Sequence, residues 1–447
     1  MERRPDAPLR PLGLSVAEDA SGLAVRKLAV EGLARLFKQG LSFDEFLDNQ
    51  HALAPRDRAF LHALIFAALR HKGEIEAVIA AFMTKPLPRK SGAAHLILLA
   101  ATAQLLFLDV AAHAVIDLSV RLAKQDREAL HFAGLINAVL RRIAVEGRDV
   151  LNSLDGPRLN TPDWLWTSWT EAYGPQQAAA IAGAHRDEPP LDVTPKSDAE
   201  GWAARLGGIA LPTGSVRLAR HSGAIEDLPG FAEGAWWVQD AAAAMPARLF
   251  GDLAGKTALD LCAAPGGKTL QLGAAGARVT AVDQSVQRLS RLRENLRRAG
   301  LEAEVIAADV LAFDPPDRFD AVLLDAPCSA TGTIRRHPDL PYVKSPEQVK
   351  ELAGLQRRML DRAAQLVMPG GRLVYCTCSL EPAEGEDQIE RFLPANPAFS
   401  TIPIRPGEAG IEGHFITGAG SLRTLPFMPI GAAMGLDGFF AARLTRS

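Results

Sequence analysis

Two segments of the chain place a cysteine directly after a predicted strand. Cys328 comes shortly after Asp325, and Cys378 ends a strand-like run that also contains Cys376. Free cysteine usually behaves as a small buried hydrophobe, which we expect of Cys262 and Cys376, because both lie inside strand-like runs. Parallel sheets bind ligands outside the carboxyl ends of their strands. Cys328 and Cys378 are therefore the two thiols expected to do chemistry.

A zinc site is the alternative use of these thiols. Cys376 and Cys378 have Cys-x-Cys spacing, whereas structural zinc sites usually use Cys-x₂₋₄-Cys, and no second close pair exists. Four cysteines in 447 residues are also too few for a disulfide scaffold. We therefore expect no metal, and free thiols of the kind found in a reducing cytosol.

A turn of small residues follows a further predicted strand. It runs through Cys262, Ala263, Ala264, Pro265, Gly266, Gly267 and Lys268. Its Gly-Lys-Thr ending suggests a phosphate-binding loop, but that motif needs a glycine at position 262. The Gly-x-Gly-x-x-Gly dinucleotide fingerprint is absent as well. What remains is a tight turn at which the backbone can approach a ligand closely.

Two aspartates end the next two predicted strands and suggest which ligand the turn would bind. Asp283 could hold ribose hydroxyls, and Asp309 could accept a hydrogen bond from an adenine amino group. A nucleoside ligand without pyrophosphate fits this set, and S-adenosylmethionine is the common one. The alternative is a structural turn whose two aspartates only cap helices.

Two thiols and a carboxylate beside a methyl donor have a chemical logic. Carbon 5 of cytosine is a poor nucleophile, but a thiolate that adds to carbon 6 makes it enamine-like and able to accept a methyl group. Asp325 is placed to protonate or hydrogen-bond N3, and a base must then remove the carbon 5 proton. Cys328 is the candidate base. Methylation of an amino nitrogen would need no thiol.

These residues require a sheet that brings the ends of several strands together. The predicted strands are residues 257–262, 278–282, 303–308, 319–324 and 372–377. Helical patterns over 285–299 and 346–368 separate some of them, which implies right-handed βαβ units and a mostly parallel sheet. Residues 438–444 are predicted to form a last edge strand.

The residues before 236 show other hydrophobic patterns than the predicted sheet does. Residues 23–147 show helical periodicity, and residues 160–233 mix helical and short strand-like runs. The longest apolar run, 93–108, is too short to span a bilayer and indicates a buried helix. The formal charge of −3 excludes nucleic-acid binding through bulk positive charge but allows a local basic face. No apolar signal sequence begins the chain, and we expect a cytoplasmic protein.

The motifs around the turn and the two cysteines resemble those of the Sun/NOL/NOP RNA cytosine-5 methyltransferases. The matching segments are 260–269, 325–332, 377–382 and 236–240, and the resemblance extends over about 236–444. It implies that Cys378 is the nucleophile and that Cys328 assists product release. It also implies that Lys268, Asp283, Asp309 and Asp325 line the cofactor and cytosine pockets, together with Arg288.

The amino-terminal segment is similar to NusB, an RNA-binding helical bundle. The similarity lies in the helices and in segments 26–27, 56–58 and 137–142. Together these features predict a multidomain chain: a flexible tail (1–20), an all-α NusB-like bundle (21–150), a small α+β module (160–235) and an α/β Rossmann-like class I methyltransferase domain (236–447). The candidate RNA contacts are Arg26, Lys27, Arg141, Arg142, Arg335 and Arg336, although a solvated helix face is an alternative for each.

These features favour an S-adenosylmethionine-dependent enzyme that forms 5-methylcytosine in small-subunit ribosomal RNA. Two alternatives stay open. The same chemistry could act on transfer RNA, or a degenerate methyltransferase fold could serve as a non-catalytic RNA-binding or assembly factor. We expect RNA as the partner, no membrane and a monomer.

Overall fold

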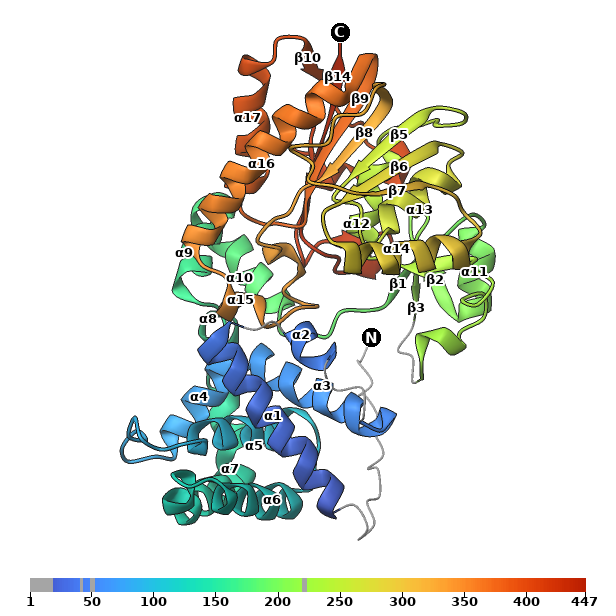
Figure 1. Ribbon diagram of the computed structural model, residues 1–447. Coiled ribbons are helices and arrows are strands. Elements are labelled where there is room, and N and C mark those ends of the chain that lie inside the picture. The colour runs from blue at the N-terminus through green and yellow to red at the C-terminus, as the bar shows by residue number, and fades with distance from the viewer. Residues whose placement is uncertain (1–18, 41–42, 49–52, 219–222) are drawn as a thin grey trace, which may run out of the picture. The chain divides into compact units, whose positions relative to one another are not determined.

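The computed structural model describes residues 19–40, 43–48, 53–218 and 223–447 and divides the chain into two compact units (Figure 1). The first unit is Met1–Pro162 with Pro341–Val343, and the second is Asp163–Leu340 with Lys344–Ser447. Residues 1–18 of the predicted tail lie outside the described residues, and the first helix begins at Asp19.

The first unit is all-helical within the described residues. Its helices are α1 (Asp19–Gln39), α2 (Phe43–Asp48), α3 (Pro55–Arg70), α4 (Lys72–Ala81), α5 (Ala94–Phe107), α6 (Ala112–Gln125), α7 (Ala133–Asn152) and α8 (Gly156–Leu159). The periodic apolar residues of α1, α3 and α7 form its core, with Leu33, Leu64 and Leu140 fully buried. Helix α5 is the predicted buried helix, and its apolar residues face neighbouring helices on all sides.

The second unit begins with a small α+β part. Its elements are α9 (Asp163–Tyr173), α10 (Pro175–Ala184), β1 (Asp192–Pro195), α11 (Ala199–Leu206), β2 (Gly208–Ala210), β3 (Val216–Leu218) and β4 (Trp236–Val238). The four strands form an antiparallel sheet in the order β2-β3-β1-β4. Trp236 at its edge is fully buried, as is Trp169 of α9, which agrees with core roles for these two tryptophans.

The rest of the second unit is built on one large sheet. Its strands are β5 (Thr257–Leu261), β6 (Arg278–Asp283), β7 (Glu304–Ala307), β8 (Phe319–Asp325), β9 (Val367–Thr377), β10 (Phe399–Thr401), β11 (Leu422–Thr424) and β14 (Phe439–Arg446). The order is β10-β14-β9-β8-β5-β6-β7, with β11 also paired to β14. Strands β5 to β9 are mutually parallel, and β14 runs antiparallel to β9. This confirms the predicted mostly parallel Rossmann-like sheet.

Helices cover both faces of this sheet (Figure 1). They are α12 (Ala241–Arg248), α13 (Gly267–Ala274), α14 (Val286–Ala299), α16 (Pro346–Leu366) and α17 (Glu386–Ala395). The short helix α15 (Leu340–Val343) does not cover the sheet, because most of it belongs to the first unit, and a separate hairpin joins β12 (Pro429–Ile430) to β13 (Ala433–Met434). Alternate strand residues belong to different cores: Leu323 packs on the α12 side, whereas Val322 and Leu324 pack on the α16 side. Burial on both faces explains why these strands are almost continuously apolar.

Local sequence signals place the helices that follow the strands. Ser345 and Gln348 form a capping box at the start of α16, with Pro346 in its first turn. Ser285 caps α14, and Gly300 ends it with a φ of 57°. Helix α14 therefore begins directly after Asp283 and leaves that aspartate at the carboxyl end of β6.

The last strand differs from the prediction. Strand β14 lies inside the sheet, between β9 and β10, and is not an edge strand. The strands that cover it, β10 and β11, have only three residues each and lie in a stretch rich in Gly and Pro. Such short runs carry no periodicity that identifies a strand.

Candidate active site

The two cysteines predicted to act together lie side by side. Cys328 follows β8 and Cys378 follows β9, and their Sγ atoms are 3.5 Å apart. Backbone bonds fix the two segments to each other, from the Ala326 amide to the Cys376 carbonyl and from the Gly332 amide to the Cys378 carbonyl, 3.0 Å each. The parallel pairing of β8 with β9 therefore brings both thiols to one end of the sheet.

The two thiols share a hydrogen bond. The hydrogen bond to Cys378, followed by burial, raises the pKa of Cys328 well above that of a free thiol. Cys328 therefore holds its proton more tightly than a free thiol does, and either sulfur can be the donor of the hydrogen bond.

An ion pair joins the first turn of α13 to the end of β8. Lys268 Nζ is 2.7 Å from Asp325 Oδ2, and the Asp325 Oδ1 atom is 3.5 Å from the Cys376 sulfur. Burial opposes the charge of Lys268, but the attraction of Asp325 outweighs it and raises the pKa of this lysine. The pair thus holds a proton close to the strand end that carries the cysteine loops.

Cys262 and Cys376 differ in how far they are buried. Cys376 is fully buried in β9, as expected, whereas Cys262 is only partly buried and follows β5 with a φ of 62°. Burial raises the pKa of both thiols, and the charge of Asp325 adds to the effect. Neither thiol is placed as a thiolate nucleophile.

The small-residue turn between β5 and α13 is tied to the end of β6. Asp283 Oδ2 accepts a hydrogen bond from the Ala264 amide at 3.2 Å, and its Oδ1 accepts one from the Ser285 amide at 2.9 Å. The Arg288 guanidinium lies 3.4 Å from Asp283 and donates to the Ala264 carbonyl. A Cβ at Gly266, where φ is 111°, would lie 3.0 Å from Leu292.

The donor and acceptor set at this turn fits a nucleoside-type methyl donor. Asp283 ends β6, and Asp309 follows β7 and accepts from the Leu311 amide at 2.9 Å, so carboxylates stand at two neighbouring strand ends. Carboxylates at these positions suit ribose hydroxyls and an amino group. The structure thus brings the turn, Asp283, Arg288 and Lys268 together, with Asp309 at the next strand end.

Known proteins are similar to most of this chain. The family of 16S rRNA methyltransferases RsmB/F matches residues 252–445, and the NusB family matches residues 23–145. Ribosomal RNA small subunit methyltransferase B of Vibrio cholerae is 36% identical over 418 residues, which is 88% of this chain and 96% of that protein. The chain belongs to the RsmB/F family of 16S rRNA methyltransferases.

Two further relatives agree with this membership. The protein of the same name from Cronobacter sakazakii is 34% identical over 94% of this chain and 98% of its own length. A solved methyltransferase homolog from Pyrococcus horikoshii is 26% identical, covers 63% of this chain and 94% of its own, and has a TM-score of 0.53. The expected combination of a NusB-like bundle and a methyltransferase domain is confirmed, and the chain is an rRNA methyltransferase that uses S-adenosylmethionine.

The predicted RNA-contact residues are not equally accessible in this RsmB/F family member. Lys27, Arg141 and Arg142 are exposed on the helical unit. Arg26 is buried and donates to Gln104 Oε1 at 2.8 Å. The expectation that Arg26 contributes to an exposed basic face is therefore corrected, because a helical pattern shows which face a side chain is on but not what covers it.

Arg335 and Arg336 are also engaged inside the protein. Arg335 is buried beside Asp437 at 3.1 Å, and Arg336 lies 2.6 Å from Asp240 and 3.0 Å from Asp437. Their charges are matched by carboxylates, so they do not form the local basic face near the site that the sequence suggested. The sequence alone shows two adjacent arginines in a polar segment. It does not show whether they face solvent or pair with distant carboxylates such as Asp240 and Asp437.

Sequence reasoning missed one buried acid near the cysteines. Glu384 lies in the short turn after β9, is fully buried, and accepts hydrogen bonds from both Ser329 and Ser379. These serines directly follow Cys328 and Cys378. Glutamate is almost never fully buried unless it is paired, and nothing in the residues around 384 indicates that it would be.

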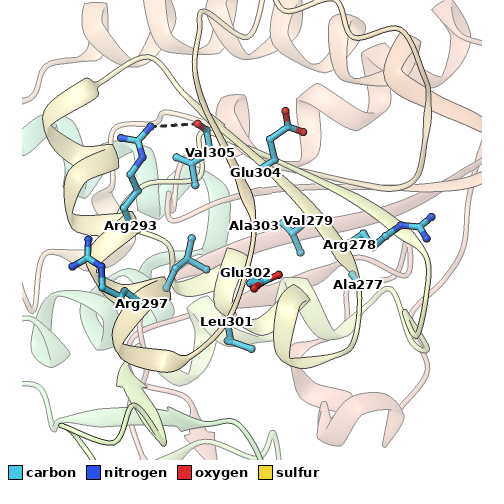
Figure 2. Close-up of a pocket in the computed structure, with 11 residues that line it drawn as sticks. Ala277, Arg278, Val279, Arg293, Arg297, Leu301, Glu302, Ala303, Glu304 and Val305 are labelled. Atoms are coloured by element: carbon cyan, nitrogen blue, oxygen red, sulfur yellow. Dashed lines mark hydrogen bonds between the residues drawn. The ribbon is translucent and has the colours of Figure 1, made fainter.

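A separate hollow of about 820 Å³ lies where β6, β7 and α14 meet (Figure 2). Arg278, Arg293 and Arg297 line it together with Glu302 and Glu304, and Arg293 donates to the Val305 carbonyl at 3.3 Å. Its lining residues include no cysteine and no part of the small-residue turn. The hollow is therefore distinct from the candidate active site.

No helix among the described residues is both long enough and apolar enough to cross a bilayer. The same described part of the chain contains no cluster of three or more His, Cys, Asp or Glu side chains suited to a metal ion.

Proposed function

We propose that this protein forms 5-methylcytosine in 16S rRNA, with Cys378 as the nucleophile and Cys328 as the base that completes the reaction. The observation that carries the proposal is the 3.5 Å separation of the two sulfur atoms at the strand ends that also carry the Lys268–Asp325 pair. A methyltransferase acting on oxygen or an amino nitrogen has no need of paired thiols.

In the first half-reaction, the Cys378 thiolate adds to carbon 6 of the cytosine. The negative charge that develops on the ring is met by a proton at N3, for which the Lys268–Asp325 pair is the source. Bound S-adenosylmethionine supplies an electrophilic methyl group, held by the 262–268 turn, Asp283, Arg288 and Asp309. Carbon 5, made enamine-like by the adduct, would accept that methyl group as its bond to the sulfonium sulfur breaks, and S-adenosylhomocysteine would leave.

In the second half-reaction, the Cys378 sulfur is bonded to carbon 6, so the thiol–thiol hydrogen bond that retains the Cys328 proton is weakened and this proton leaves to solvent. The resulting Cys328 thiolate takes the proton from carbon 5. The electrons of that C–H bond restore the double bond between carbons 5 and 6. The bond from carbon 6 to the Cys378 sulfur breaks, and Cys378 leaves as a thiolate. The N3 proton returns to the Lys268–Asp325 pair.

The RNA has to present an unstacked cytosine to these loops. Enzymes that modify a base inside paired RNA or DNA act on single-stranded or flipped nucleotides. We therefore propose that the substrate is a cytosine that can be unstacked from 16S rRNA, and that the helical unit contributes docking contacts through exposed cations such as Arg141 and Arg142.

The two cysteine variants test the proposal directly. With unmodified 16S rRNA transcript and labelled S-adenosylmethionine, Cys378→Ala should lose methyl transfer by at least about 1000-fold, because no adduct forms. Cys328→Ala should instead accumulate an RNA–protein adduct that survives denaturing electrophoresis. Bisulfite sequencing of the product should locate the modification at cytosine. Normal turnover by Cys378→Ala would exclude this nucleophile.

A further inference from the structure

One buried carboxylate connects the two cysteine loops. Glu384 Oε1 accepts a hydrogen bond from the Ser329 amide at 2.9 Å, and Glu384 Oε2 accepts one from the Ser379 hydroxyl at 2.6 Å. The Ser329 hydroxyl donates to Oε2 as well. Ser329 follows Cys328 and Ser379 follows Cys378, so a single side chain is bonded to the neighbours of both thiols.

Helix α16 contributes a further donor to the same carboxylate. Gln356 Nε2 lies 2.9 Å from Glu384 Oε1 and 2.9 Å from the carbonyl of Pro327, the residue before Cys328. The Glu384 main chain is held too, since its carbonyl accepts from the Tyr375 hydroxyl at 2.7 Å and from Thr377 Oγ1 at 3.2 Å. Helix α16 and strand β9 therefore fix the position of the Glu384 carboxylate independently of its bonds to the two cysteine loops.

The burial of this charge makes the arrangement restrictive. Glu384, Ser329, Ser379 and Gln356 are all fully buried. A buried carboxylate is stable only while both of its oxygens accept hydrogen bonds. Loss of a donor leaves part of the charge without a partner, which costs folding free energy. Moving the Cys378 loop would withdraw the Ser379 hydroxyl, and moving the Cys328 loop would withdraw both the Ser329 amide and the Ser329 hydroxyl, so Glu384 holds the two loops together.

We propose that Glu384 is the positioning residue for both thiols, acting on Cys328 through Ser329 and on Cys378 through Ser379. This inference rests on the proposed function above and deepens it. A displacement of about 1 Å in a reacting group can slow a reaction by about 100-fold. The two serines affect different steps. Ser379 positions Cys378 for adduct formation, and Ser329 positions Cys328 for the proton removal that releases the product.

The serine variants separate the two half-reactions. Under single-turnover conditions with unmodified 16S rRNA transcript, Ser379→Ala should slow adduct formation by about 10- to 100-fold. Ser329→Ala removes the hydroxyl donor to Glu384 but keeps the amide donor. It should leave adduct formation within about threefold of wild type but raise the adduct fraction several-fold, as Cys328→Ala does. Glu384→Gln, which weakens both links, should slow both steps. Serine-to-alanine changes are small, so the test stands even if Glu384→Gln fails to fold.

The controls distinguish positioning from general damage. Affinity for S-adenosylmethionine, measured by calorimetry, should stay within twofold in all three variants, since the hydrogen bonds of the Glu384 carboxylate go to Ser329, Ser379 and Gln356 and not to the 262–268 turn or Asp283. Glu74→Gln removes a similarly buried carboxylate in the helical unit and should alter neither step.

The proposal fails if either serine variant slows both steps equally, or if both variants match wild type on both steps. Failure of the proposed function looks different. In that case Cys378→Ala would keep activity, or Cys328→Ala would form no adduct, whatever the serine variants do.

Discussion

Asp260 shows how a single residue beneath the small-residue turn can affect the whole molecule. Its side chain is fully buried at the end of β5, and its Oδ2 accepts a hydrogen bond from Thr269 Oγ1 at 2.6 Å. The other oxygen, Oδ1, has no hydrogen-bond partner among the residues that the structure describes. Burial raises the pKa of Asp260 to about 7, so the folded protein favours its neutral form up to near-neutral pH.

We predict that Asp260 makes the protein less stable as the pH rises. In the unfolded chain this carboxyl ionises near pH 4, so between about pH 4 and 7 the folded state binds the extra proton. Stability from this group is therefore complete at low pH and is lost as the pH approaches 7, by roughly 1.4 kcal/mol per pH unit at most. Asp260→Asn should flatten this part of the curve, as measured by urea unfolding between pH 4.5 and 7.5.

Asp314→Asn provides the matched control for this prediction. Asp314 is exposed, and its hydrogen bond to Arg362 lowers its pKa, so it titrates below this window. Its variant should keep the wild-type slope. An unchanged slope in Asp260→Asn would contradict the proposed titration.

At the scale of elements, helix α9 and strand β11, which are not among the parallel strands, hold the loop that follows Cys378. Helix α9 supports the segment after Cys378: Trp169 Nε1 donates to Glu381 Oε1 at 3.1 Å, and the Tyr173 hydroxyl donates to the Leu380 carbonyl. Arg423 of β11 donates to the Ser379 carbonyl at 2.6 Å. Helix α9, which contains Trp169, therefore supports the loop that carries Cys378.

Arg335 and Arg336 hold the segment after β8 in place through ion pairs with Asp240 and Asp437. Arg336 joins Asp240, the cap of α12, to Asp437, which precedes β14. We predict that Arg336→Ala lowers the free energy of unfolding by about 3 kcal/mol, because it leaves two buried carboxylates poorly matched. RNA affinity of the folded fraction should not change. Urea unfolding and filter binding measure the two effects.

Arg142→Ala is the companion variant, since Arg142 is exposed on α7. It should change stability by less than about 0.5 kcal/mol. A loss of RNA affinity in Arg336→Ala without a loss of stability would show that Arg336 binds RNA directly.

At the scale of the whole molecule, a net charge of −3 gives no general attraction to RNA. Binding must come from local cations, and the helical unit exposes Lys27, Arg141 and Arg142. We predict that Arg141→Ala with Arg142→Ala weakens 16S rRNA binding and reduces the slope of log affinity against log salt by about 1.5, the release of two counterions. Filter binding from 50 to 300 mM salt measures the slope.

Cofactor affinity should be unaltered in this double variant, because both arginines belong to the helical unit and the cofactor turn to the other. A slope equal to that of wild type would assign the RNA contacts to other residues.

Much of the fold could be predicted because its signals are local. Strands β5, β6 and β8 are apolar runs that end at a polar residue or turn, and α14 and α16 begin at Ser285 and Ser345, whose side chains cap them. The pairing of Cys328 with Cys378 followed from a general rule that parallel strands end at one edge of the sheet. Each of these predictions used residues close together in the chain or one rule of topology.

The remaining features depend on partners far away in sequence. The order of residues alone was enough to indicate a helical bundle followed by a methyltransferase sheet, a small-residue turn for the cofactor and two thiols at neighbouring strand ends. Only folding decided that Arg26, Arg335 and Arg336 are engaged by Gln104, Asp240 and Asp437, that β14 is covered by β10 and β11, and that Glu384 is buried between two serines. The reason is physical: burial and charge pairing depend on which distant groups arrive at the same place, and periodicity or spacing along the chain carries no record of that.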